Sequence, residues 1–264
     1  MSCPNCVIGG LLPGEPTGIT SFQNAYLAAA PSESPSKRAV LLLTDIFGLA
    51  YNNPKIIADK LAKDINCDVW VPDYFNGEPI IKPESMAAAP PTGVKASWQT
   101  WLNFILLLIP RLFVYYRNRP TVVYTRLKEF IHALKREKEY DTIGAVGYCY
   151  GGSQAVLIAS SGLVNSIVVC HPGSLTVEQI KAINIPASWV LAEEDFLFPE
   201  AIRDQAEAIF ASRKAKSEYV DYEFVIYKGT THGFAGRPDL SHPMVKEAYE
   251  NAFKQTVDWF RRTL

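Results

Sequence analysis

The segment from Gly147 to Gly151, with the sequence Gly-Tyr-Cys-Tyr-Gly, constrains the fold of this chain more than any other feature. It follows an apolar run over 142–146 and leads into a helix-forming stretch from Gly152 onward. A chain that passes so quickly from strand to helix must turn sharply, and the glycines keep side chains out of the corner. Such a turn holds Cys149 above the sheet at the amino end of a helix, where the helix dipole and free N–H groups favour a thiolate. The pattern predicts a nucleophile elbow with cysteine in place of the usual serine; the alternative is an ordinary buried cysteine at a strand end.

The order of apolar and amphipathic segments predicts an α/β fold. Short apolar runs typical of buried strands occur at 37–44, 69–71, 143–148, 166–170 and 187–191, and an alternating strand pattern at 219–227. Helical patterns occur at 54–65, 126–138, 154–161, 199–214 and 244–262. Strands that alternate with helices form a mainly parallel, twisted sheet with helices on both faces, a three-layer sandwich. The length fits a single domain over 1–264, with its active site in loops at the carboxyl ends of the strands.

The segment 75–118 is long for a connection between a strand and the next helix, so we expect an insertion or lid-like segment there. Its early part is polar and rich in proline, and its later part is aromatic and apolar. We expect a helix that packs on the domain and offers one face to a substrate pocket, with simple packing on the core as the alternative. The apolar stretch 101–116 is too short to span a bilayer and is interrupted by Pro110 and Arg111.

Composition and charge exclude several classes of function. A net charge of −1 gives no reason to expect nucleic acid or an anionic membrane as a partner. The first ten residues lack the basic start and apolar core of a signal peptide, and five cysteines are too few for a disulfide scaffold, which together predict a cytoplasmic location. Cys3 and Cys6 form a CxxC pair without a second pair of ligands, so we expect no metal site and a structural or incidental role for them.

A cysteine nucleophile needs a base, and the base needs an acid that orients it. With a nucleophile elbow the chain order is nucleophile, acid, histidine. After Cys149, three consecutive acids follow the strand expected at 187–191, and His232 follows the strand expected at 219–227. Both positions lie at the edge of the sheet where Cys149 is expected. We therefore predict Asp195 as the orienting acid and His232 as the base, with Glu193 and Glu194 as solvated loop charges.

The other three histidines fit the role of base less well. His132 lies inside an expected helix, and His242 has the position of a helix-entry residue. His171 follows the strand expected at 166–170, so it lies near the same edge of the sheet and is a candidate for lining the pocket. Because His171 precedes Asp195, it breaks the expected order of acid and base.

An oxyanion intermediate is stabilised by N–H donors aimed at the developing charge. One donor comes from the residue after the nucleophile, here Tyr150, and a second from the loop after an early strand. Ile46 is the candidate in that loop. The neighbouring Asp45 is an ionisable group at the mouth of the loop, and capping of the loop or of a nearby helix is its alternative role.

From about Ala39 to its end, the sequence resembles the dienelactone hydrolase (carboxymethylenebutenolidase) family of the α/β-hydrolase fold. The segment 147–152 is similar to the family's G-x-C-x-G-G elbow, and Asp195 with a proline four residues later resembles its acid loop. His232, followed by Gly-Phe-Ala and then Arg237, resembles its histidine loop, and the sequence Val-Pro-Asp-Tyr at 71–74 resembles the end of an early strand. The resemblance implies a Cys-His-Asp triad of Cys149, His232 and Asp195.

The resemblance also implies residues that gate the site or bind substrate. In well-known members a glutamate in the early loop holds the resting thiol and moves when substrate binds; Asp45, one methylene shorter, stands at the matching position. Members that act on dienelactone hold the substrate carboxylate with two arginines. Arg237 resembles one of them, displaced by an inserted glycine, and the second would fall within 75–118, where Arg111 and Arg117 are candidates.

These observations lead us to expect a cofactor-free, cysteine-dependent hydrolase that acts on small lactones or activated esters through an acyl-enzyme, as a monomer or homodimer. One alternative is a broader carboxylesterase or thioesterase whose 98–116 region lines an acyl pocket. Another is a catalytically weak member that serves as a binding or regulatory protein. The complete set of Cys149, Asp195 and His232 argues against this last alternative.

Overall fold

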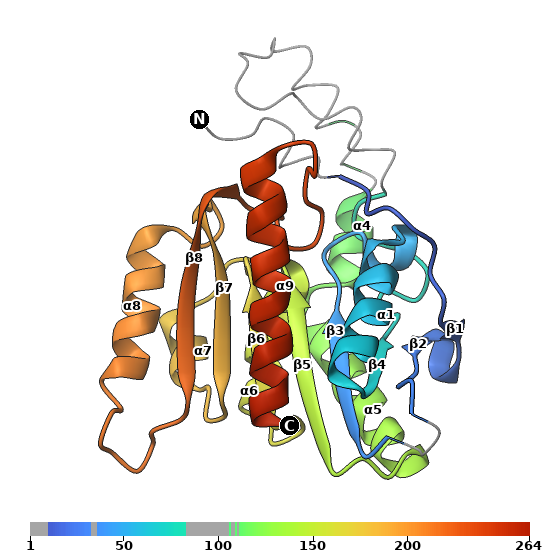
Figure 1. The fold of residues 1–264 in the computed structure, drawn as a ribbon, viewed down its shortest axis with the longest axis horizontal. Coiled ribbons are helices and arrows are strands. Elements are labelled where there is room, and N and C mark those ends of the chain that lie inside the picture. Colours follow the sequence, from blue (N-terminus) through green and yellow to red (C-terminus); the bar gives the residue numbers. More distant parts are fainter. Residues whose placement is uncertain (1–9, 33–35, 83–105, 107–108, 110) are drawn as a thin grey trace.

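The structure of the chain, a computed structural model, describes residues 10–32, 36–82, 106, 109 and 111–264. These residues form an eight-stranded sheet in the order β1-β2-β4-β3-β5-β6-β7-β8 (Figure 1). The strands are β1 (Ile19–Thr20), β2 (Tyr26–Ala28), β3 (Arg38–Leu43), β4 (Asp68–Val71), β5 (Thr142–Tyr148), β6 (Ser166–Cys170), β7 (Ala187–Glu194) and β8 (Tyr222–Thr231). Strand β2 is antiparallel to β1 and β4, and the other pairs are parallel. The carboxyl ends of β3 to β8 therefore meet at one edge.

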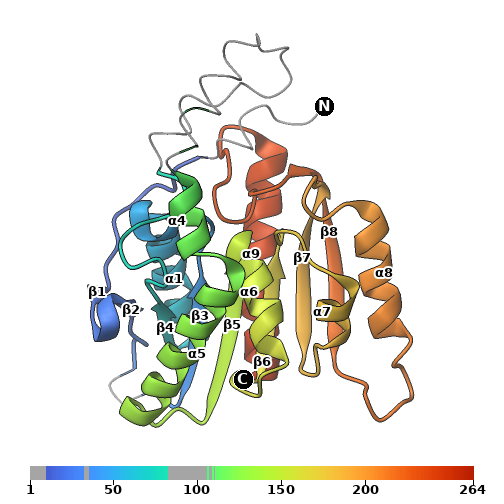
Figure 2. The same cartoon turned by 180° about the vertical axis from the view of Figure 1, so that it is seen from behind.

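Helices cover both faces of the sheet and give three layers, as the front and back views show (Figures 1 and 2). One face carries α1 (Asn53–Ile65) and α9 (Pro243–Thr263), and the other carries α5 (Pro120–Glu137), α6 (Tyr150–Ala159), α7 (Val177–Lys181) and α8 (Glu200–Ala211). Side chains of β3 alternate between the two cores: Leu41 and Leu43 belong to the α5 and α6 side, and Val40 and Leu42 to the α1 and α9 side. Because both faces are buried, the central strands have continuous apolar sequences.

Local sequence explains where several helices begin and end. Helix α1 has Pro54 in its first turn, where a missing N–H is tolerated, and ends at Asn66, whose φ of 49° is left-handed. Helix α7 starts with a capping box, in which Thr176 accepts from the N–H of Gln179 and the Gln179 side chain accepts from the N–H of Thr176. Helix α9 follows His242, which occupies the N-cap position expected of a helix-entry residue.

The α/β fold with a mainly parallel sheet, expected from the sequence, is confirmed. Some elements are longer than expected: β7 reaches Glu194, β8 reaches Thr231, and α6 already begins at Tyr150. The edge strands β1 and β2 and helix α7 were not expected, because elements of two to five residues carry no readable periodicity. The segment expected over 75–118 is described mainly at its two ends, which include α4 (Arg111–Arg117); Cys3 and Cys6 lie outside the described residues.

Candidate active site

Cys149 occupies a sharp turn between β5 and α6. Its φ of 54° and ψ of −113° are a strained combination for a residue with a side chain. A Cβ at Gly147 would lie 2.1 Å from the carbonyl oxygen of Gly151, and a Cβ at Gly151 would lie 2.1 Å from the carbonyl oxygen of Leu43. The N–H of Cys149 donates to the carbonyl of Cys170 at the end of β6 (3.1 Å). The expected elbow is therefore present, and both flanking glycines are required by close backbone contacts.

The thiol of Cys149 is unpaired and largely buried, with the residue 8% exposed. Cys149 occupies the N-cap position of α6, where the first N–H groups of a helix have no acceptor within the helix. These groups and the helix dipole create a site that favours negative charge. The position thus suits a thiolate and the oxyanion that its attack would produce.

His232 and Asp195 form a hydrogen-bonded pair at the ends of β8 and β7. The Nδ1 atom of His232 lies 3.0 Å from Oδ1 and 2.9 Å from Oδ2 of Asp195. The carboxylate is fixed in turn, because its Oδ1 accepts hydrogen bonds from the N–H groups of Leu197 (2.9 Å) and Phe198 (3.2 Å). With Nδ1 engaged, Nε2 is the ring nitrogen left for other contacts, and it is buried on the side of the ring away from Asp195.

The pKa of His232 is raised to about 10 by its surroundings. Burial acts most strongly and lowers this pKa, but the contact with Asp195 and the neighbouring Cys149 together outweigh it. Cys149 raises the pKa of the ring through a side-chain contact and through the negative charge of its thiolate form. The structure thus brings Cys149, His232 and Asp195 together, in surroundings that favour the protonated form of the His232 ring.

The remaining histidines occupy three different environments. His132 is exposed on α5, and His242 lies at the start of α9, 3.6 Å from the carboxylate of Asp239. His171 does follow β6 near the thiol, but its ring is packed beneath His232 instead of lining an open pocket, with 1% of the residue exposed. Sequence order identified the edge of the sheet on which His171 lies and gave no indication that it touches His232.

Asp45 and Arg237 form an ion pair near the elbow. Arg237 Nε donates to Asp45 Oδ2 at 2.8 Å, and both side chains are mostly buried. The other carboxylate oxygen of Asp45 accepts from the N–H of Phe47 (3.0 Å), and the Arg237 guanidinium lies 4.6 Å from the centre of the Phe47 ring. The loop-capping role considered for Asp45 is thus present, and its carboxylate is directed at Arg237.

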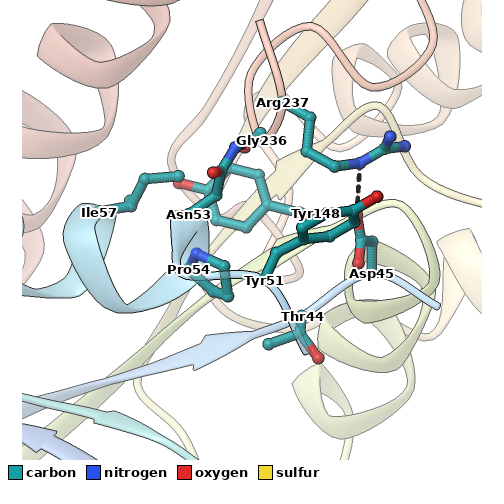
Figure 3. Close-up of a pocket in the computed structure, with 9 residues that line it drawn as sticks. All are labelled: Thr44, Asp45, Tyr51, Asn53, Pro54, Ile57, Tyr148, Gly236 and Arg237. Carbon is teal, nitrogen blue, oxygen red and sulfur yellow. Dashed lines mark hydrogen bonds and ion pairs between the residues drawn. The ribbon is translucent and has the colours of Figure 1, made fainter. Parts of the chain in front are cut away.

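A small cavity lies beside the Asp45–Arg237 pair (Figure 3). Its other lining residues are Thr44, Tyr51, Asn53, Pro54, Ile57, Tyr148 and Gly236. Its volume of about 20 Å³ leaves room for about one water-sized molecule, so it is too small to be the substrate pocket. Asn53 links α1 to this loop, because its side chain donates to the carbonyl oxygen of Gly236 (3.1 Å).

Arg111 and Arg117, the candidates for a second substrate-binding arginine, join the two ends of the 75–118 segment. Arg111 donates to the carbonyl oxygens of Pro79 and Ile80, and both arginines form ion pairs with Glu78, at 3.6 and 3.8 Å. Arg111 thus holds main chain and carboxylate in place with a side chain that is 14% exposed, whereas the side chain of Arg117 is 55% exposed. Arg111 in particular is a structural tie between the strand side and the helix side of this segment.

Exposed apolar side chains flank the Cys149–His232 region. Phe196 is 73% exposed, and its ring centre lies 5.6 Å from that of His232. On α4, the exposed apolar residues are Leu112, Phe113, Tyr115 and Tyr116. Burial is the main cause that raises the pKa of Tyr150, and Tyr115 raises it further, which places Tyr115 near the residue that follows Cys149. The sequence analysis did not select Phe196 as a site residue. Its position directly after Asp195 could have indicated that it lies near His232.

Glu193 is exposed to solvent, as expected, but it lies in a strand instead of a loop. It belongs to β7 and its carboxylate accepts hydrogen bonds from the N–H of Gly229 (2.8 Å) and from Lys228 (2.8 Å) on β8. It therefore helps to join β7 to β8 near the strand ends that carry Asp195 and His232. Glu194 is exposed, as expected.

The described residues contain neither a cluster of metal ligands nor a membrane-spanning helix. Among them, no group of three or more histidine, cysteine, aspartate or glutamate side chains is arranged to hold a metal ion. None of the helices in this part of the chain combines the length and the apolar character needed to cross a bilayer.

Comparison with known proteins extends the resemblance seen in the sequence. The family model "Dienelactone hydrolase family" matches residues 24–264, beginning earlier than Ala39. The chain is 33% identical to "Hydrolase pyvD" of Aspergillus violaceofuscus, over 98% of this chain and 96% of the relative. It is 28% identical to "Hydrolase tropI" of Talaromyces stipitatus, over 97% of this chain and 94% of the relative.

Among solved structures, a putative dienelactone hydrolase from Klebsiella pneumoniae superposes with a TM-score of 0.62 at 15% identity, covering 89% of this chain and 91% of that one. At this identity the likeness concerns the fold alone, and it agrees with the sheet and the helical layers described above. The family match, by contrast, spans the elbow, the acid loop and the histidine loop. The chain belongs to the dienelactone hydrolase family of α/β-hydrolase fold and is a carboxylic ester hydrolase.

Proposed function

We propose that this chain is a cysteine-dependent hydrolase of lactones or activated esters, with Cys149 as nucleophile, His232 as base and Asp195 as the acid that orients it. The observation that carries the proposal is the His232–Asp195 pair beside a thiol at a strained strand–helix turn. Strained backbone persists where the surrounding structure enforces it, and such positions concentrate at active sites. The free thiol also supports a reducing, cytoplasmic location, which keeps a cysteine nucleophile active.

The reaction would begin with attack of the Cys149 thiolate on the substrate carbonyl. The N–H groups of Tyr150 and Ile46 would stabilise the oxyanion; Tyr150 is the first residue of α6, so its N–H has no acceptor within the helix. Protonated His232 would donate a proton from Nε2 to the leaving oxygen as the tetrahedral intermediate collapses to a thioester. Neutral His232 would then take a proton from water, which attacks the thioester and releases the acid and the thiol.

The chemistry of a thioester intermediate favours particular leaving groups. A thiolate is itself a good leaving group, so the first intermediate returns to substrate unless the departing oxygen is stabilised. An enol leaving group tautomerises to a ketone and does not attack again. Enol-lactones and activated esters are therefore better matched to Cys149 than simple alkyl esters.

The Asp45–Arg237 pair favours an uncharged substrate. For Arg237 to bind a substrate carboxylate, its contact with Asp45 must first open, and separating a mostly buried pair is costly. Asp45 would thus control whether Arg237 is available, and Arg237 would bind the carboxylate of an anionic substrate. A matched substrate pair tests this: a dienelactone carboxylate and its methyl ester. Asp45→Asn should raise kcat/KM for the carboxylate relative to the ester, and an unchanged ratio would contradict the role of the pair.

A second candidate is a broader carboxylesterase or thioesterase that acts on apolar acyl substrates. The observation in its favour is the exposed apolar surface formed by Phe196 and α4 on either side of the reactive region. Exposed apolar patches of this kind commonly mark binding surfaces. Under this alternative, kcat/KM rises with the length of the acyl chain.

The deciding experiment compares kcat/KM of the wild type and of Cys149→Ala on four substrates: a dienelactone, a short-chain and a medium-chain p-nitrophenyl ester, and an acyl thioester. Preference for the lactone supports the first proposal, and preference for the medium-chain ester or the thioester supports the second. Cys149→Ala should be inactive on all of them. A folded wild type that hydrolyses none of the four would favour a binding or regulatory protein.

A further inference from the structure

A second histidine is buried against His232. His171 directly follows β6, and its N–H continues the ladder by donating to the carbonyl of Val190 (2.8 Å). Its ring centre lies 5.2 Å from that of His232, with the planes 72° apart, an edge-to-face arrangement. Tyr148 and Phe234 complete the surroundings of the ring, at 6.0 and 5.8 Å. His171 therefore forms the buried support of His232, on which Phe196 lies from the exposed side.

His171 is neutral at physiological pH. Burial lowers its pKa well below the ordinary value, and the positive charges of His232 and Arg237 lower it further. Tyr148, the remaining titratable group in ring contact, has a pKa raised well above its ordinary value by burial, so it too stays uncharged. The charge next to His171 is consequently that of protonated His232, and beyond it that of Arg237.

By itself, the buried position of the His171 ring lowers the stability of the folded protein. Both ring nitrogens are buried, and neither forms a hydrogen bond to another of the described residues. A neutral imidazole carries one donor and one acceptor, and leaving buried polar groups unpaired lowers stability. The backbone φ of 34° adds strain. A residue of this kind in a well-packed core calls for an explanation other than packing.

We propose that His171 is a positioning residue, whose neutral buried ring stabilises protonated His232 and holds it between Asp195 and Cys149. The proposal rests on the function proposed above for Cys149 and His232. A cation within about 6 Å of the centre of an aromatic ring is attracted to the face of that ring, and the attraction grows when water is excluded. Stabilising the imidazolium also stabilises the thiolate that forms beside it. His171 thus acts through His232 and touches no reacting atom.

The test is the pH dependence of Cys149 alkylation by iodoacetamide, which requires no knowledge of the substrate. His171→Asn removes the ring, and asparagine tolerates a positive φ. We expect the midpoint of the rate profile to rise by about one pH unit, so that labelling on its acid side falls about tenfold. His171→Phe keeps an aromatic ring at this position, so its midpoint should stay close to that of the wild type and well below that of the Asn variant.

The matched control is His132→Asn, which changes an exposed histidine on α5 and should leave the profile unchanged. Thermal melts separate the proposal from a purely structural role, under which His171→Asn lowers the melting temperature but keeps the wild-type midpoint. That result in a folded variant overturns the proposal. If Cys149 of the wild type reacts no faster than the buried Cys67, the proposed function fails and the inference fails with it. If Cys149 of the wild type reacts fast but the His171 variants keep the wild-type midpoint, the inference about His171 fails while the proposed function stands.

Discussion

Replacing Asp195 with asparagine tests how much the pairing with His232 contributes to catalysis. The side chain is 3% exposed, and an amide of the same shape can still accept from the N–H groups of Leu197 and Phe198. What is lost is the negative charge opposite His232 Nδ1, at 2.9 to 3.0 Å. The substitution should therefore leave the fold intact while it removes the support for the imidazolium.

The magnitude follows from the kind of contact that is lost. A hydrogen bond to a charged group contributes about 1.5–3 kcal/mol, and a unit charge about 4 Å away near a protein surface contributes about 4 kcal/mol. A loss of about 2–4 kcal/mol in the transition state corresponds to a fall in kcat/KM of about 30- to 1,000-fold. The fall should appear mainly in kcat, because Asp195 acts through His232.

The assay is steady-state hydrolysis of the best substrate from the four-member panel, together with circular dichroism to establish folding. The matched control is Glu194→Gln, which neutralises the adjacent exposed acid and should leave kcat/KM within about twofold, as is typical of surface changes. A folded Asp195→Asn enzyme with kcat/KM within threefold of the wild type would refute the reasoning, and the search for the acid would return to the neighbouring strand ends.

Three further predictions concern the thiol, the imidazole and the elbow. Iodoacetamide should label Cys149 well before Cys67 and Cys170, because burial raises the pKa of these two thiols to about 12 or higher. Peptide mapping that finds equal labelling rates would count against an activated nucleophile. The pKa of His232 is raised from 6.5 to about 10, so its stabilising contribution is complete below pH 6.5 and is lost as the pH rises through 10. The unfolding free energy of the wild type relative to His232→Gln, measured by urea titration, should therefore fall between pH 7 and 10, and a constant difference would contradict this assignment. Gly151→Ala places a Cβ 2.1 Å from a carbonyl oxygen and should cost about 3 kcal/mol or more, against about 1 kcal/mol for Gly77→Ala in open space at φ 75°; equal urea midpoints for the two variants would contradict the close packing.

The sequence predicted the central part of the fold well because the central strands are buried on both faces. Strands β3, β5, β6 and β7 therefore appear as uninterrupted apolar runs. The edge of the sheet could not be predicted in the same way. Strands β1 and β2 have two and three residues, and their pairing depends on β4, which follows much later in the chain.

The proximity of the three candidate catalytic residues was predictable because each follows a strand end in a fixed order. Cys149 lies between strong glycine signals, and Asp195 and His232 follow β7 and β8. The pairing of Asp45 with Arg237 joins residues far apart in the chain, and no local pattern predicts which carboxylate an arginine will contact. The contact between His171 and His232 has the same character, because it depends on how two loops pack over the sheet.

The central claim is that Cys149 forms an acyl-enzyme, and rapid-quench mass spectrometry with a p-nitrophenyl ester tests it most directly. The account predicts a transient mass increase equal to the acyl group, located on the peptide that contains Cys149 and absent from Cys149→Ala. His232→Gln should slow both the appearance and the decay of this adduct. Hydrolysis by Cys149→Ala at the wild-type rate, or an adduct on any other residue that forms and decays at the rate of turnover, would contradict the account.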